Sequence, residues 1–106
     1  MDEFKGDEDI LDKMITIYLQ KSEHYFTDLA DLIKEQKLED IKHLSHQFKG
    51  AISNFTIDSP FKTLREIESL AKAGQLEAMT PLMDSLKSQL VTLDNALKEL
   101  KMQLQT

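Results

Sequence analysis

The stretch between Gly6 and Gly50 contains neither glycine nor proline, and the first proline of the chain is Pro60. Glycine and proline are the residues that most often end or interrupt a helix, so only polar turns can break helical structure here. The whole chain holds 3 glycines and 2 prolines among 106 residues. This scarcity favours long helices over a β fold, whose many turns need such residues.

Apolar residues recur at helical spacing in four segments of the chain. The first segment covers about residues 8–36, and its apolar face is interrupted at Ser22 and Glu23. We therefore expect a short leading helix that bends into a longer one. The second segment covers about residues 38–55, and its apolar stripe is formed by Ile41, Leu44, Phe48, Ile52 and Phe55.

The third segment has recognisable ends. Ser59 is expected to be its N-cap, with Pro60 at the first helical position, and Gly74 is expected to end it. The fourth segment carries apolar residues that alternate spacings of three and four, namely Met83, Leu86, Leu90, Leu93, Leu97, Leu100 and Leu104.

The repeat in the fourth segment suits either an intermolecular coiled coil or the core of one folded chain. The residues beside it show no consistent charge pattern, which favours packing within the chain. Four amphipathic segments joined by short turns then predict an all-α fold, an antiparallel up-down-up-down four-helix bundle with a short leading helix. We expect residues 1–106 to form a single domain.

Acidic residues outnumber basic ones, 19 to 13, for a net charge of −6. Such a chain is repelled by nucleic-acid backbones and anionic lipid surfaces, so neither is an expected partner. The absence of cysteine excludes disulfides, zinc–thiolate sites and thiol catalysis. No signal-peptide pattern is visible, and no apolar run reaches the ~20 residues that span a bilayer. We expect a cytoplasmic protein.

The second segment places His46 almost opposite its apolar stripe, because a helix turns about 100° per residue. Lys42, Lys49, Gly50 and Ser53 share the His46 side. The imidazole is therefore predicted to be exposed, with a cation one turn away. Neutral imidazole is a nucleophile near pH 7, since its reference pKa is about 6.5. Such a nucleophile suits the reversible capture of a phosphoryl group. Lys49 could offset part of the negative charge that a phosphoryl group on the imidazole would bring.

Gly50 lies in the interior of the second segment, where glycine costs about 0.5–1 kcal/mol relative to alanine. Two explanations fit this position. Another molecule packs closely against the helix beside His46, or the helix simply tolerates the glycine. The residue alone does not decide between them.

The run from His46 to Ser53, HQFKGAIS, resembles the signature of histidine-containing phosphotransfer (HPt) domains of two-component phosphorelays. That signature is His, any residue, an apolar residue, Lys, Gly and then small residues. The resemblance extends over about residues 10–100. It implies a phosphorelay carrier that accepts a phosphoryl group on His46 from a receiver-domain aspartate and passes it to another response regulator.

The resemblance also implies the partners, which are response-regulator receiver domains, a hybrid sensor histidine kinase, or both. The receiver would supply the Mg²⁺, and the chain itself would need no cofactor. Lys49 would stabilise the phosphoryl group. The surface on which the receiver docks would be formed by Lys42, Gly50 and Ser53.

Glu68 is a candidate for orienting the imidazole. In some relatives a glutamate on the next helix hydrogen-bonds the second nitrogen of the active histidine, and counting without gaps puts Glu68 there. Glu68 also lies at the edge of the third segment's apolar stripe, where a carboxylate needs a partner. The sequence departs from the family pattern nearby, with Thr56 for a usual glycine and Pro60 for a usual leucine. These departures alter the turn on which the position of Glu68 depends.

Three alternatives stay open. His43 and His46 with Glu39 or Asp40 could bind a metal, although bundle metal sites usually draw ligands from several helices. The histidine of a kinase dimerisation helix is disfavoured because Gln47 follows His46 and no Gly-rich nucleotide loop is present. The chain is therefore not expected to be an enzyme with ATP-dependent kinase activity. The main alternative is a non-catalytic helical module for interaction or dimerisation, whereas the carrier is expected to be a monomer.

Overall fold

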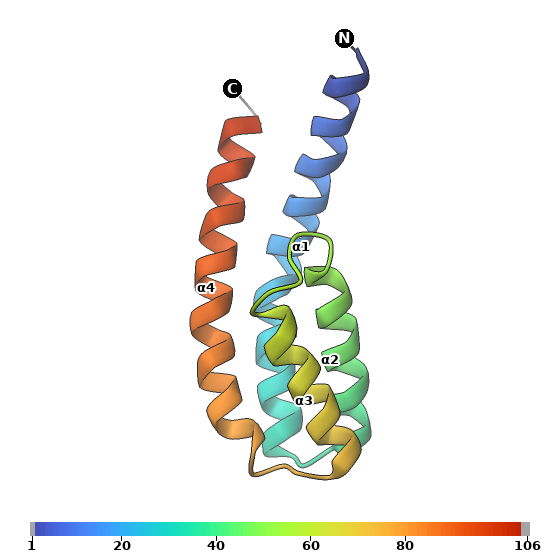
Figure 1. Ribbon diagram of the computed structural model, residues 1–106, viewed down its shortest axis with the longest axis vertical. Coiled ribbons are helices and arrows are strands. Elements are labelled where there is room, and N and C mark those ends of the chain that lie inside the picture. Colours follow the sequence, from blue (N-terminus) through green and yellow to red (C-terminus); the bar gives the residue numbers. More distant parts are fainter. Residues whose placement is uncertain (1, 105–106) are drawn as a thin grey trace.

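Four α-helices make up the part of the chain that the structure describes. The computed structural model describes residues 2–104, with side chains from residue 9 onward. Its helices are α1 (Asp2–Lys34), α2 (Leu38–Ile52), α3 (Phe61–Ala73) and α4 (Met79–Leu104). No strand occurs among residues 2–104, so the predicted all-α class is confirmed. Figure 1 shows each helix running back alongside the one before it, with both chain ends at the same end of the molecule.

The first helix differs from the expectation. Residues 2–34 form one continuous helix, so no short leading helix bends at Ser22 and Glu23. Ser22 is buried, and its Oγ donates a hydrogen bond of 2.9 Å to Asp94 Oδ2 on α4. Because the hydroxyl is satisfied by another helix, it does not compete for the backbone of α1. Glu23 stays exposed and leaves the helix unbroken.

The core is built from one apolar face of each helix. α2 packs against α1 and α3, and α4 packs against the same two helices. The fully buried apolar side chains of the described helices include Ile15, Leu29, Ile41, Phe48, Ile52, Leu64, Ile67, Met79 and Leu86. Leu90 and Leu97 of the leucine repeat are buried as well, so this repeat packs within its own chain. Each such side chain contributes about 1.5–3 kcal/mol through burial.

The connection between α2 and α3 also differs from the expectation. α2 ends at Ile52, earlier than predicted. Phe55 lies in the turn that follows, where its own amide donates a hydrogen bond of 2.8 Å to the Ile52 carbonyl. Its side chain packs against the core. Pro60, not Ser59, is the N-cap residue of α3. The Asp58 carbonyl accepts the amide of Phe61 at 2.7 Å, so the first turn needs no serine hydroxyl.

The end of α3 follows the prediction. Gly74 has φ +73°, a left-handed conformation that glycine adopts without steric cost. The amides of Gly74 and Gln75 return to the carbonyls of Ala71 and Leu70 at 3.2 and 2.9 Å. This pairing satisfies the last carbonyls of the helix. With both of its ends fixed, α3 packs alongside α2.

Candidate functional site

His46 projects from the outer side of α2. Its side chain is 69% exposed, which confirms the exposure predicted from its place opposite the apolar stripe. Phe48, two positions later, is fully buried and stacks on Tyr25 of α1 with ring centroids 4.9 Å apart. The stacked pair fixes the rotation of α2 about its own axis, so the imidazole stays turned outward.

Glu68 comes from α3 and is 7% exposed. Its Oε2 lies 3.2 Å from His46 Nδ1, and its Oε1 accepts a hydrogen bond of 2.7 Å from Lys49 Nζ. A buried carboxylate is costly unless it is paired, and these two contacts supply the pairing. The structure therefore brings the three side chains for which the sequence suggested chemistry, His46, Lys49 and Glu68, into one cluster.

Glu68 is ionised beside the imidazole, and this limits how the ring can hydrogen-bond to it. Burial by itself raises the pKa of Glu68, but the hydrogen bond and charge of Lys49, and then those of His46, outweigh it and lower that pKa below its ordinary value. Glu68 is thus ionised at neutral pH, and a carboxylate can only accept hydrogen bonds. The hydrogen-bond network then assigns the proton to Nδ1 and the free lone pair of the neutral ring to Nε2.

Two lysines border the carboxylate. Lys49 has a side chain that is only 18% exposed, and its Nζ also lies 5.8 Å from the centroid of the Phe61 ring. The carboxylate and the aromatic face together hold it in place. Lys72 is 61% exposed, and its Nζ lies 3.7 Å from Glu68 Oε2. Lys72 was not among the predicted site residues, although its position four residues after Glu68 on the same helix was a usable signal.

The predicted docking residues lie along α2. Gly50 and Ser53 are exposed, and Ser53 Oγ donates a hydrogen bond of 2.6 Å to the Gly50 carbonyl. A Cβ at Gly50 would meet no atom within 4 Å, so no close approach within the described chain explains this glycine. Lys42 is partly exposed and pairs with Glu39 of its own helix at 2.8 Å. The open face beside His46 is therefore centred on Gly50 and Ser53.

The residues of the metal alternative point in different directions. His43 Nε2 lies 3.3 Å from Glu39 Oε1, whereas His46 turns to Glu68. Asp40 is exposed. Over the part of the chain that the structure describes, no three His, Asp or Glu side chains form a group that could hold a metal ion.

The two departures from the family pattern lie in the connection that leads to α3. Thr56 Oγ1 accepts the amide of Asp58 at 3.1 Å, and Pro60 is buried at the start of the helix. Glu68 still reaches His46 within hydrogen-bond distance. The changed turn is thus compatible with the cluster.

A family model described as Hpt domain matches residues 13–103. The match includes His46, Lys49 and Glu68, and it spans all of α2 and α3. Neither the curated proteins nor the solved structures compared with the chain gave a significant match. Among the described residues, no helix combines the length and apolar character needed to cross a membrane.

Proposed function

The chain belongs to the Hpt domain family, the histidine phosphotransfer domains of two-component phosphorelays, and on this premise we propose that His46 accepts a phosphoryl group from a receiver-domain aspartate and passes it to another response regulator. The observation that carries the proposal is the 3.2 Å contact between Nδ1 and Glu68, on a ring that is 69% exposed. It leaves the nucleophilic Nε2 available to a partner.

The imidazole ring neither gains nor loses a proton during the transfer. The Nε2 lone pair forms a bond to phosphorus while the phosphorus–oxygen bond to the receiver aspartate breaks, and its electron pair returns to that carboxylate. Nδ1 keeps its proton, so the ring becomes an imidazolium ion. The Glu68 carboxylate stabilises the positive charge that develops there. Transfer to the second receiver returns the ring to its neutral form without any proton movement.

Lys49 acts on this reaction from a fixed position. Its 2.7 Å hydrogen bond keeps Glu68 charged and oriented, and its ammonium group adds positive potential near the phosphoryl group. Gly50, Ser53 and Lys42 form the surface on which the receiver docks. The missing side chain at Gly50 lets a partner backbone approach the helix beside His46.

We propose that the receiver supplies the Mg²⁺. Glu68, the carboxylate beside His46, is already engaged by two lysines and the imidazole, and a metal ion would have to compete with all three. We also propose that the carrier acts as a monomer, because the buried leucines of α4 are used in its own core. Sedimentation should give the monomer mass. A dimer that dissociates with Leu93→Glu, together with no phosphoryl uptake, would support the interaction module instead.

The test uses a receiver domain that has been charged with acetyl phosphate. The wild-type chain should take up the phosphoryl group, and His46→Gln should take up none. His43→Gln is the matched control, because His43 lies on the same helix with a side chain 68% exposed. It should be phosphorylated like the wild type. Equal labelling of His46→Gln and the wild type would end the proposal.

A further inference from the structure

The two lysines beside Glu68 are held very differently. Lys49 Nζ lies 2.7 Å from Oε1 in a side chain that is 18% exposed, whereas Lys72 Nζ lies 3.7 Å from Oε2 in a side chain that is 61% exposed. A separation of 3.7 Å is too long for a hydrogen bond, so Lys72 is attracted by charge alone. Of the two ammonium groups, that of Lys72 is the one free to move.

Lys72 and the imidazole share one oxygen. Glu68 Oε2 lies 3.2 Å from His46 Nδ1 and 3.7 Å from the ammonium group of Lys72, whose side chain is largely open to solvent. Lysine has a flexible four-carbon stem and three donors, so a change of rotamer can redirect it. A phosphoryl group on the ring brings about −1.5 to −2 charges, more than the single charge of the carboxylate.

The consequences of moving each lysine are unequal. If Lys49 turned to the phosphoryl group, Glu68 would lose its shortest hydrogen bond while remaining buried. If Lys72 turned, Glu68 would lose no hydrogen bond and would keep both Lys49 and His46. Moving Lys72 to the phosphoryl group therefore costs less free energy than moving Lys49, because Glu68 keeps all its hydrogen bonds.

From this geometry we infer that Lys72 is the lysine that contacts the phosphoryl group on His46, moving there from Glu68 Oε2, while Lys49 remains on Glu68 as a positioning residue. The inference rests on the proposed function and deepens it. Lys72 belongs to α3 and lies outside the signature run from His46 to Ser53.

Lys62 provides a matched control on the same helix. Its side chain is 56% exposed, and its Nζ lies 3.6 Å from Asp58, a carboxylate four residues away. It thus repeats the exposure, spacing and charge of Lys72, but its partner is not the carboxylate that contacts His46. Lys62→Gln and Lys72→Gln each remove one exposed lysine from an ion pair; Asp58 is itself exposed, whereas the buried Glu68 keeps Lys49 and His46, so both variants should keep the urea unfolding midpoint of the wild type.

The experiment uses phosphoramidate, a small donor that needs no receiver. Its phosphorus–nitrogen bond breaks, ammonia leaves, and phosphorus bonds to Nε2. The rate of His46 phosphorylation should fall about two- to five-fold in Lys72→Gln, in line with the effect of an exposed charge pair. Lys62→Gln should match the wild type, and Lys72→Arg should restore the rate. In ¹⁵N spectra of the lysine ammonium groups, the Lys72 signal should shift on phosphorylation while that of Lys62 stays in place.

The outcomes separate the two proposals. A wild-type chain that takes up no phosphoryl group on His46 contradicts the proposed function itself. If the wild type is phosphorylated but Lys72→Gln reacts at the Lys62→Gln rate, only the role of Lys72 is overturned. A shift of the Lys49 ammonium signal in place of the Lys72 signal overturns it as well.

Discussion

Two pairs of helices each hold a carboxylate between them, and the two carboxylates are compensated in different ways. Between α2 and α3, Glu68 meets Lys49 and the exposed imidazole of His46. Between α1 and α4, Asp94 accepts one hydrogen bond from Ser22 at 2.9 Å. Its other oxygen, Oδ1, is buried without a hydrogen-bond partner in the described chain.

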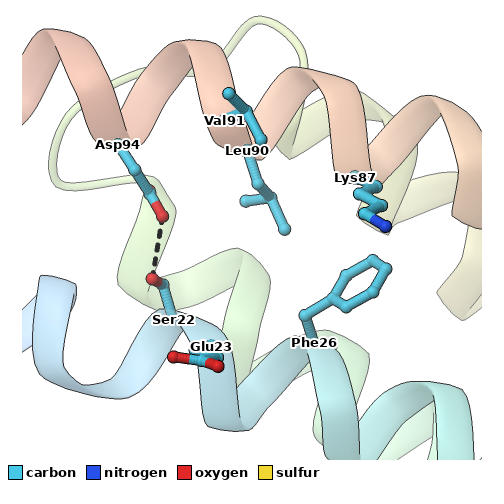
Figure 2. A pocket seen from close by; sticks show the side chains of 7 residues that line it. All are labelled: Ser22, Glu23, Phe26, Lys87, Leu90, Val91 and Asp94. Carbon is cyan, nitrogen blue, oxygen red and sulfur yellow. Dashed lines mark hydrogen bonds between the residues drawn. The ribbon is translucent and has the colours of Figure 1, made fainter.

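The surroundings of Asp94 are mostly neutral. Figure 2 shows the Ser22–Asp94 hydrogen bond at one end of a hollow between α1 and α4, with Lys87 at the other end. Burial, followed by the charge of Asp94, raises the pKa of Tyr18.

The difference between the two sites teaches how each carboxylate is used. Asp94 Oδ2 accepts a hydrogen bond from a neutral hydroxyl inside the bundle while Oδ1 has no hydrogen-bond partner in the described chain, so this contact serves to join α1 and α4. Glu68 is satisfied by cationic groups and by a ring that extends into solvent. Of these two arrangements, the one around Glu68 contains cationic side chains and an exposed ring that can interact with an incoming phosphoryl group.

The largest expected contrast is in phosphoryl transfer. Glu68→Gln removes the charge that orients the ring and stabilises the imidazolium ion, so transfer to His46 should slow by roughly 10- to 100-fold, as when a histidine loses its orienting carboxylate in metal sites. Asp94→Asn keeps an acceptor for Ser22 and should transfer at the wild-type rate. Single-turnover transfer from a charged receiver measures both. Equal slowing in the two variants would remove the functional distinction between the sites.

The next comparison, between one variant at each carboxylate, distinguishes an effect on folding stability from an effect on the rate of phosphoryl transfer. Lys49→Met and Ser22→Ala each remove one hydrogen bond to a carboxylate, so each should lower the free energy of unfolding by about 1.5–3 kcal/mol. Urea titration measures this loss. Only Lys49→Met should also slow transfer, measured where both variants are folded. Slower transfer in Ser22→Ala would show that the α1–α4 site contributes to the chemistry.

The acid response of Glu68 gives a smaller effect. Because the pKa of Glu68 is lowered in the folded chain, its ionised form stabilises the fold above the ordinary glutamate pKa of 4.5, and this contribution is lost as pH falls through the folded value. The side chain in Glu68→Gln does not titrate. The difference in unfolding free energy between wild type and variant should therefore shrink between about pH 7 and about pH 3. A difference that grows on acidification contradicts the ion-pair account.

The smallest effect concerns the open face. Gly50→Ala should raise the free energy of unfolding by about 0.5–1 kcal/mol, since a Cβ there meets no atom within 4 Å. A destabilised variant would show that the glycine serves the fold itself. Gly50→Leu should leave the bundle folded but slow transfer by crowding the receiver. Its rate with phosphoramidate, which needs no docking, should stay unchanged.

Much of the site follows from helical periodicity. The apolar stripe of α2 fixes Phe48 inside and therefore His46 outside, and Gly74 ends α3 for a reason that is local to its backbone. These features depend on residues close together in sequence or on one helix face. The place of Glu68 was instead implied by the family resemblance, through a count along the chain without gaps, and in the structure its Oε2 lies 3.2 Å from His46 Nδ1.

The features that the sequence did not predict depend on distant partners. α1 continues through Ser22 because the hydroxyl bonds to Asp94, 72 positions away, and no local pattern shows this. The N-cap position of α3 depends on how Pro60 is buried against the core. Lys72 gains a role only because α2 and α3 lie side by side and bring an imidazole to Glu68.

The most direct test of the central claim is to identify the ring nitrogen that carries the phosphoryl group. The chain is phosphorylated with phosphoramidate, and the product is examined by ¹⁵N- and ³¹P-coupled spectra of the imidazole, with His46→Gln as the blank. The structure predicts an acid-labile phosphoryl group on Nε2 of His46, with a proton retained on Nδ1 beside Glu68. Phosphorus on Nδ1, or on His43 or His24 while His46 stays unmodified, would contradict the account.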